Sequence, residues 1–259
     1  MAALHVPGGR LTVHDEADTV RHIAANRASI ARFGDGELML MLGYGIYFQE
    51  YDRELAARLL EIVQNPRPDF LVCLPRFDGM IINNPVWKKR WARYRRLYSY
   101  LARRGCNYHS AALPRPATVG NREPAAFYRT LAELWASRDV VVVHHKAATA
   151  EHAMFRGVRS MHHLACRAEH AFRDYASLLA EACALHTTPD VLFLIAAGPT
   201  AGVLAWDLNQ RGAQALDVGH LTSAYDEHVR EFPRAALQFE EQVRGTGSLR
   251  TETSQGIGK

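Results

Sequence analysis

Two acidic residues alternate with two glycines in the stretch RFGDGE, which places Gly34, Asp35, Gly36 and Glu37 in a row. We expect an extended segment after a short strand, in which side chains two residues apart point the same way. Two carboxylates on one face could share a hard divalent cation, which prefers oxygen ligands and keeps positions open for water or phosphate. The glycines would let a diphosphate approach the backbone. The competing interpretation is a plain Asp-Gly turn with solvated acids.

A second turn, AAGPTAG, joins a buried strand pattern to a helix pattern. Helix N-termini bind phosphates through free N–H groups and the helix dipole, so Gly198, Pro199 and Thr200 are candidates for a nucleotide site. Pro199 suits a first helical turn, and Thr200 could cap the helix or contact a phosphate. An ordinary strand-to-helix turn is the alternative. The turn is neither GxGxxG nor Walker A, so dinucleotide and P-loop interpretations lack their fingerprints.

Four further side chains are candidates by residue type. Arg32 could hold a diphosphate as a bidentate partner or form a salt bridge to a surface acid. Arg122 could contact phosphate or acceptor, although an ordinary loop arginine is the simpler interpretation. His220 could bind the donor or act as a base, because a histidine pKa can be tuned near neutrality; a core histidine is the alternative. Asp217 could anchor His220 or a ribose, or cap a strand end.

These residues must be positioned by an alternation of strands and helices. Hydrophobic runs predict strands over residues 28–34, 69–75, 138–145 and 213–220, and a strand, glycine turn and helix over 189–212. Helical periodicity predicts helices over residues 15–27, 52–65, 85–105, 123–137 and 168–186. This alternation favours an α/β fold with a mostly parallel sheet and helices on both faces. Ligands of such folds bind at the carboxyl ends of the strands, where the candidate residues fall.

Composition narrows the class of protein. The chain has 259 residues and a net charge of +4, too small an excess to indicate nucleic acid by itself. We expect one domain over residues 1–243 and a disordered, polar, glycine-rich tail over 244–259. None of the four cysteines forms a CxxC pair, which suits a reducing cytoplasm. We see no signal peptide and no apolar run long enough to span a bilayer.

The predicted helix over residues 86–104 is unusually basic and aromatic. Its aromatic and apolar residues at helical spacing are Trp87, Trp91, Tyr94, Tyr98 and Leu101. Its cations include Lys88, Lys89, Arg90, Arg93, Arg96, Arg103 and Arg104. One interpretation is core aromatics with a solvated basic face. The other is peripheral contact with an anionic membrane, where aromatics and cations meet headgroups; nucleic acid is the third choice.

The motifs RFGDGE, FQEYDRELAARLLEI and AAGPTAGVLAWDLNQRGAQALDVGH occur in an order that resembles the GT-D type of bacterial glycosyltransferase domain. The resemblance covers residues 30–225. It implies a Rossmann-like fold, a nucleotide-sugar donor and a role in polysaccharide biosynthesis. It also implies a divalent metal at the metal–diphosphate site, held by the DxE acids Asp35 and Glu37. The glycine turn at residue 198 would lie at the nucleotide end.

The last family motif, roughly GHxDxEYxW, is altered to GHLTSAYDEH in this chain. Gly219, His220 and Tyr225 fit it, whereas Thr222 and Ala224 replace the expected acids. If the reaction inverts the anomeric centre it needs a general base, and the candidates are then Asp226, Glu227 and His220.

We therefore expect a glycosyltransferase that depends on Mn²⁺ or Mg²⁺ and moves a sugar, most simply from a UDP-sugar, to a glycan or lipid-linked glycan. A cytoplasmic protein, peripheral at the inner face of the membrane, would suit such an acceptor. One alternative is a metal-dependent nucleotide phosphohydrolase or phosphotransferase, which would use the same acids. Another is a non-enzymatic basic binding module, in which the basic helix is the working surface and Asp35 is dispensable.

Overall fold

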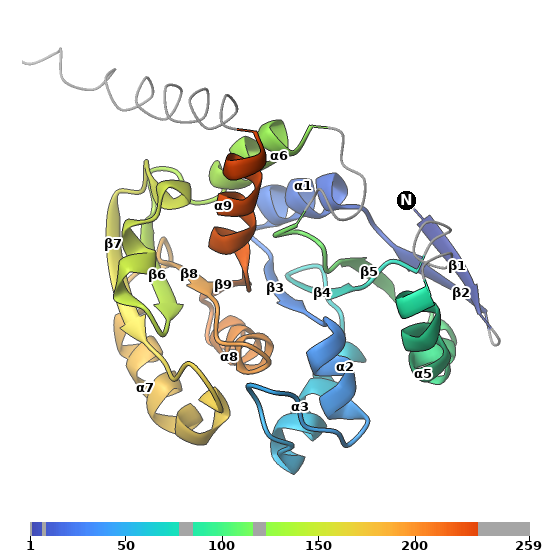
Figure 1. Cartoon of the computed structure of the whole chain (residues 1–259). Coiled ribbons are helices and arrows are strands. Elements are labelled where there is room, and N and C mark those ends of the chain that lie inside the picture. Colours follow the sequence, from blue (N-terminus) through green and yellow to red (C-terminus); the bar gives the residue numbers. More distant parts are fainter. Residues whose placement is uncertain (1, 7–8, 78–84, 116–122, 233–259) are drawn as a thin grey trace, which may run out of the picture.

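A nine-stranded sheet forms the centre of the computed structural model, which describes residues 2–6, 9–77, 85–115 and 123–232 (Figure 1). The strand order is β1-β2-β5-β4-β3-β9-β8-β6-β7. The strands are β1 (Ala2–Val6), β2 (Gly9–Val13), β3 (Ser29–Arg32), β4 (Phe70–Leu74), β5 (Asn107–Ser110), β6 (Asp139–His144), β7 (Ser160–Ala165), β8 (Leu192–Ile195) and β9 (Gln214–Asp217). Strand β1 pairs antiparallel with β2, and all the other pairings are parallel. The expected α/β fold with a mostly parallel sheet is confirmed.

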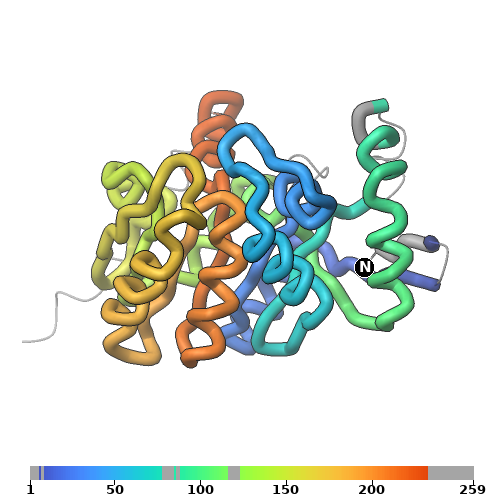
Figure 2. The backbone as a smooth tube through the Cα atoms, turned by 90° about the horizontal axis from the view of Figure 1, so that it is seen from below, coloured from blue at the N-terminus to red at the C-terminus, as the bar shows by residue number. Residues whose placement is uncertain are grey.

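Helices cover both faces of the sheet (Figures 1 and 2). One face carries α3 (Arg53–Val63), α5 (Pro85–Ala102), α7 (Tyr175–Leu185) and α8 (Thr200–Asn209), together with the short α2 (Asp35–Met41). The other carries α1 (Glu16–Asn26), α6 (Pro124–Ala132) and α9 (Leu221–Glu231). Three 3₁₀ segments complete the described elements: η2 (Ala147–Glu151), η3 (Ala153–Phe155) and η4 (Ala171–Asp174).

The central strands are apolar because both of their faces are covered. All four residues of β8 and all five of β4 are buried, as expected for parallel strands between two helical layers. Two hydrophobic clusters result, one on each face of the sheet. Helix α8 packs closely on β3, because Gly202 leaves room for Ala31. The sheet is therefore a rigid platform for the loops at its carboxyl edge.

Several elements differ from the sequence expectations. Residues 35–41 form helix α2 instead of an extended segment, and residues 221–231 form helix α9. The sequence patterns also missed β1, β2, β5 and β7. Arg122 and the predicted tail over residues 244–259 lie outside the described residues. No described helix has both the length and the apolar character needed to cross a membrane.

Strands β3 and β9 lie side by side, but the chain leaves them toward opposite faces of the sheet (Figure 1). After β3 it enters α2 on the face that carries α3, and after β9 it enters α9 on the face that carries α1. In open α/β folds, ligands bind at the carboxyl ends of the strands where such a reversal occurs. This region of the chain is here called the crevice. Arg32 and Asp217 end these two strands.

Candidate active site

An ion pair between Arg32 and Asp217 occupies the floor of this crevice. The Arg32 backbone N–H donates to Asp217 Oδ2 at 3.0 Å, and Arg32 Nε donates to the Asp217 carbonyl oxygen at 3.0 Å. The guanidinium lies 3.5 Å from Asp217 Oδ1, and Nη1 also donates to the Ala111 carbonyl at 3.1 Å. Arg32 thus forms a salt bridge, but its partner is the buried Asp217 and not the surface acid that was the alternative to a diphosphate. Burial raises the pKa of Asp217, and the charge of Arg32 opposes that shift.

Gly219 makes room for this ion pair. Its φ of +46° lies in the left-handed region, which favours glycine. A Cβ at this position would overlap Arg32 Nη2. Glycine is therefore required in the DVGH stretch because the side chain of Arg32, which ends a strand far away in the sequence, occupies the space that a Cβ would need.

Glu37 lies next to the ion pair, in the first turn of α2. Its Oε2 accepts from the Gly34 backbone N–H at 2.7 Å, so the side chain folds back over the N-cap of its own helix. Burial and the neighbouring Asp217 carboxylate raise the pKa of Glu37 to about 7. Two carboxylates therefore share the crevice floor with one guanidinium.

Asp35 points away from Glu37, so the expectation that the two acids lie on one face of an extended segment is wrong. Residues two apart on a helix are separated by about 200° around its axis. The Asp35 carboxylate accepts from the Tyr94 hydroxyl and lies 3.3 Å from Arg90 Nη2, both on α5. Burial and Asp35 together raise the pKa of Tyr94, which keeps the phenol protonated as a donor. The Cα of Gly36 faces Ile46 of the following loop.

The turn after β8 lies two strands from β3 on the same carboxyl edge. Gly198 has φ +57°, and a Cβ there would lie 3.2 Å from Phe48 Cε2. Pro199, not Thr200, is the N-cap residue of α8, and Thr200 is the first helical residue. The Thr200 hydroxyl is buried and has no hydrogen-bond partner in the described part of the chain. A helix N-terminus and an unsatisfied buried hydroxyl therefore stand together at this turn.

The candidate bases lie on α9 or at its start. His220 is the N-cap residue of α9; the packing around its ring, together with Arg115 and Arg32, lowers its pKa. Asp226 is exposed, and its Oδ1 lies 3.0 Å from His152 Nε2. His152 Nδ1 accepts from the Met154 N–H, so the proton of a neutral His152 is on Nε2, facing Asp226. Glu227 is exposed.

Sequence reasoning missed several residues that contact the predicted ones. They are Tyr94 and Arg90 beside Asp35, Phe48 beside Gly198, and His152 beside Asp226. Each comes from a segment remote in sequence, and nothing in its local pattern identifies the partner. Gly219 is the exception, because a glycine between Asp217 and His220 is a visible signal for a special backbone position.

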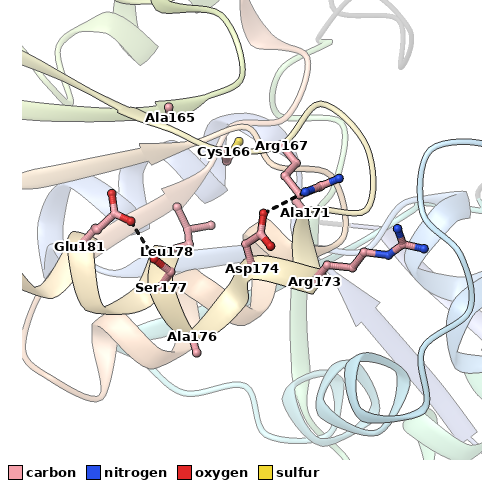
Figure 3. A pocket seen from close by; sticks show the side chains of 10 residues that line it. All are labelled: Ala165, Cys166, Arg167, Ala171, Arg173, Asp174, Ala176, Ser177, Leu178 and Glu181. Carbon is pink, nitrogen blue, oxygen red and sulfur yellow. Dashed lines mark hydrogen bonds and ion pairs between the residues drawn. The ribbon is translucent and has the colours of Figure 1, made fainter.

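A separate hollow lies beside β7, η4 and the start of α7 (Figure 3). None of the predicted site residues lines it. Its charges are largely satisfied internally: Arg167 pairs with Asp174 at 3.2 Å, and Ser177 donates to Glu181 at 2.9 Å. The predicted site residues therefore have no part in this hollow.

The chain matches the family described as glycosyltransferase GT-D fold over residues 30–242. It belongs to this family. It is 32% identical over 223 residues to glycosyltransferase GlyD of Streptococcus pneumoniae serotype 4 (strain ATCC BAA-334 / TIGR4). It is 34% identical over 210 residues to the probable glycosyl transferase Gly of Streptococcus gordonii. These matches cover 81% and 77% of this chain but only 26% and 30% of the relatives, so the chain spans under a third of their length.

Solved structures of GT-D proteins show the same fold. One is described as the highly conserved domain of unknown function 1792, with a distinct glycosyltransferase fold. It has a TM-score of 0.74 and 32% identity over 85% of this chain and 82% of that one. Another, a new glycosyltransferase (DUF1792) from Streptococcus sanguinis, has a TM-score of 0.72 and 28% identity over 83% and 84% of the two chains. The predicted resemblance to the family is confirmed.

Replacement of Gly219 by alanine tests the constraint set by the ion pair. Gly219→Ala should lower the free energy of unfolding in urea by about 2 kcal/mol more than Gly105→Ala, because the new Cβ displaces Arg32 from Asp217. Gly105 is the matched control: its φ is +66°, and a Cβ there meets nothing within 4 Å. Equal losses for the two variants would show that only backbone strain matters.

The raised pKa of Glu37 predicts a pH dependence of stability. Between pH 4.5 and about 7 the unfolded state releases this proton while the folded state keeps it, so stability should fall as pH rises and level off above about 7. The fall should be on the order of 3 kcal/mol. Glu37→Gln should lack it. Urea unfolding of both proteins in a chelator provides the measurement, and parallel pH profiles would contradict the assignment.

Proposed function

We propose that this chain transfers a sugar from a nucleotide-diphosphate sugar, with the donor bound across the crevice between the β3 and β8 turns. The main support is the turn at Gly198, where the N-terminus of α8 and the unsatisfied buried Thr200 hydroxyl offer hydrogen bonds to a phosphate or ribose. The ten-residue length of α8 supplies a helix dipole that favours an anion. Family membership supports sugar transfer over phosphate hydrolysis as the reaction that we propose for this site.

We further propose that Mn²⁺ or Mg²⁺ takes part, held by carboxylates on the β3 side of the crevice. No three acidic, histidine or cysteine side chains form a ready metal cluster among the described residues. Glu37 and Asp217 offer carboxylate oxygens beside a single guanidinium, which would suit a hard cation. Asp35 is held by Tyr94 and Arg90, so it would have to turn away from α5 to join them. A bound cation would stabilise the diphosphate leaving group as a Lewis acid.

The acceptor hydroxyl would lose its proton at the α9 side of the crevice. His220 lies at the start of this helix, and its surroundings together with Arg115 and Arg32 lower the pKa of its imidazole, which favours the neutral form that can accept a proton. Asp226 is oriented by the His152 Nε2 proton and is the second proposed base. Glu227 is the third. The proton of the acceptor hydroxyl would pass to one of these groups as the sugar–oxygen bond forms and the nucleoside diphosphate leaves.

Calorimetry with UDP, with and without Mn²⁺, tests the donor site. Asp35→Asn and Glu37→Gln should each weaken Mn²⁺-dependent UDP binding about tenfold, roughly 1.4 kcal/mol, because each removes an oxygen ligand. Asp69→Asn is the matched control, since Asp69 is an exposed acid just before β4, at the opposite edge of the sheet. Unchanged affinity in both site variants would refute the metal site. Release of phosphate from UDP without any sugar would favour the phosphohydrolase alternative.

We propose a peripheral membrane contact through the cations of α5. The expectation that the aromatic and apolar residues of this helix meet the membrane is wrong for Tyr94, Tyr98 and Leu101, which are fully buried in the core. The cations are outside, since Lys88, Lys89 and Arg93 are exposed near the start of the helix, on the same rim as Asp35. A lipid-linked acceptor would thereby be brought to the crevice.

Charge reversal tests the membrane contact. Changing Lys88, Lys89 and Arg93 to glutamate should reduce low-salt binding to phosphatidylglycerol vesicles, because each cation near an anionic surface contributes about 1 kcal/mol. Reversal of Arg103 and Arg104, just beyond the other end of α5, should cost less binding per charge. Soluble UDP affinity should not change in either set. A wild-type protein that ignores such vesicles at low salt would refute the contact.

A further inference from the structure

Exposed aromatic side chains gather in the segment between α2 and α3, residues 42–52, here called the aromatic segment. Of the eight large hydrophobic side chains that are exposed in the described residues, five belong to it: Leu42, Tyr44, Tyr47, Phe48 and Tyr51. Tyr47 is 92% exposed and Tyr44 is 56% exposed. Apolar surface concentrated in this way marks a place where something binds.

The aromatic segment is held in one conformation by its own backbone and by α2. Ile46 and Gln49 exchange backbone hydrogen bonds of 2.8 and 3.2 Å, and the Gln49 side chain is buried. The Ile46 side chain packs where a Cβ on Gly36 would lie, 2.9 Å from Ile46 Cδ1. The glycine at the second position of α2 therefore anchors the segment, and its rings are presented without a large loss of entropy on binding.

The far end of the aromatic segment is bound to η4. The His170 N–H donates to the Phe48 carbonyl at 2.9 Å, and the Glu50 N–H donates to His170 Nδ1 at 3.0 Å. The Arg173 guanidinium donates two hydrogen bonds, of 2.7 and 2.8 Å, to the Glu50 carboxylate. Arg173 also lines the hollow of Figure 3.

These contacts place the aromatic segment along the border of the donor crevice. It begins directly after the helix that carries Asp35 and Glu37. The Phe48 ring lies against the Gly198 turn. In Figure 1 the segment crosses from α2 toward α8 and η4 on the face that carries α3. A molecule resting on these rings would therefore lie next to a bound donor.

The charge of the segment indicates what kind of molecule this is. Residues 42–52 contain two acids, Glu50 and Asp52, and no lysine or arginine. The two acids would repel an anionic bilayer or a nucleic acid, and the segment has no cation to attract either of them, whereas the cations of α5 would. A neutral molecule with apolar faces and many hydroxyl groups fits better. Tyrosine suits such a molecule because it joins a flat apolar ring to a hydroxyl that can donate and accept.

We propose that the aromatic segment binds the neutral sugar rings of the acceptor glycan, with Tyr44 and Tyr47 stacking on their C–H faces. The inference rests on the proposed function, because only a glycosyltransferase needs an acceptor sugar beside its donor. It assigns the acceptor to a surface that the donor and metal residues do not form. Recognition by ring faces selects a sugar polymer over its lipid carrier.

Binding of cellotriose, maltotriose and chitotriose, followed by saturation-transfer NMR and calorimetry, tests the proposal. We expect at least one of them to bind at millimolar concentration, and the double variant Tyr44→Ala, Tyr47→Ala to weaken it about tenfold. Tyr47→Phe should retain most of the affinity, because the ring remains. Tyr100→Ala is the matched control, since Tyr100 is an exposed tyrosine of α5 outside the segment.

Three results would overturn the proposal. These are failure of all three sugars to bind, unchanged affinity in the double variant, or vesicle binding that depends on Tyr44 and Tyr47. UDP binding in Mn²⁺, measured on the same proteins, separates the two inferences. Tyrosine-dependent sugar binding without UDP binding would support the aromatic segment and refute the donor site. UDP binding without sugar binding would support the donor site and refute sugar binding by the aromatic segment.

Discussion

The ion pair of Arg32 and Asp217 is the constraint on which the rest of the site depends. The two halves of the sheet meet at β3 and β9, where the register pairs Ile30 with Leu216. Beyond that pairing, the ends of the two strands are joined by the side chain of Asp217 bonded to both the backbone and the guanidinium of Arg32. Loss of either partner would leave a buried charge unpaired, which typically costs 3–5 kcal/mol. The pair thus joins the halves of the sheet and shapes the crevice with the same atoms.

The electrostatics of the crevice follow from this pair. Burial and the Asp217 carboxylate raise the pKa of Glu37, and the charge of Arg32, which already pairs with Asp217, offsets only part of that rise. Asp35 does not take part in these interactions, because its carboxylate is bound to Tyr94 and Arg90 of α5. The two acids of the DxE stretch therefore have different environments: Glu37 has a raised pKa, and Asp35 is ion-paired. A cation or a diphosphate entering the crevice would meet a site whose charges are nearly balanced.

The sequence predicts the parts of this fold that depend on local patterns. Continuous apolar runs identified the central strands, and apolar periodicity identified α1, α3 and α5. It failed at β5, whose sequence NYHS has no apolar run and becomes a strand through pairing with β2 and β4. It also failed at α2, where the alternating glycines and acids suggested an extended segment. The Gly34-to-Glu37 spacing of a capping box is the local signal that could have found this helix.

Residue roles proved harder to predict than elements, because partners come from distant segments. Arg32 and Asp217 are 185 positions apart, and neither sequence context indicates the other. The aromatic residues of α5 have a spacing that fits a core face or a membrane face equally well. Only the packing of Tyr98 and Leu101 into the cluster beneath α5 decides between them.

The attachment of the aromatic segment is unequal at its two ends. At α2, Ile46 packs in the place of a missing Cβ and Gln49 is buried, so release there disturbs the core. At η4, the Glu50–Arg173 pair is about half exposed on both sides, and such pairs contribute little in water and less in salt. Local opening should therefore begin at η4 and leave the crevice floor intact, with ionic strength setting how often it occurs. Under the proposed assignment, an acceptor sugar would therefore leave the aromatic segment without any disturbance of the donor site.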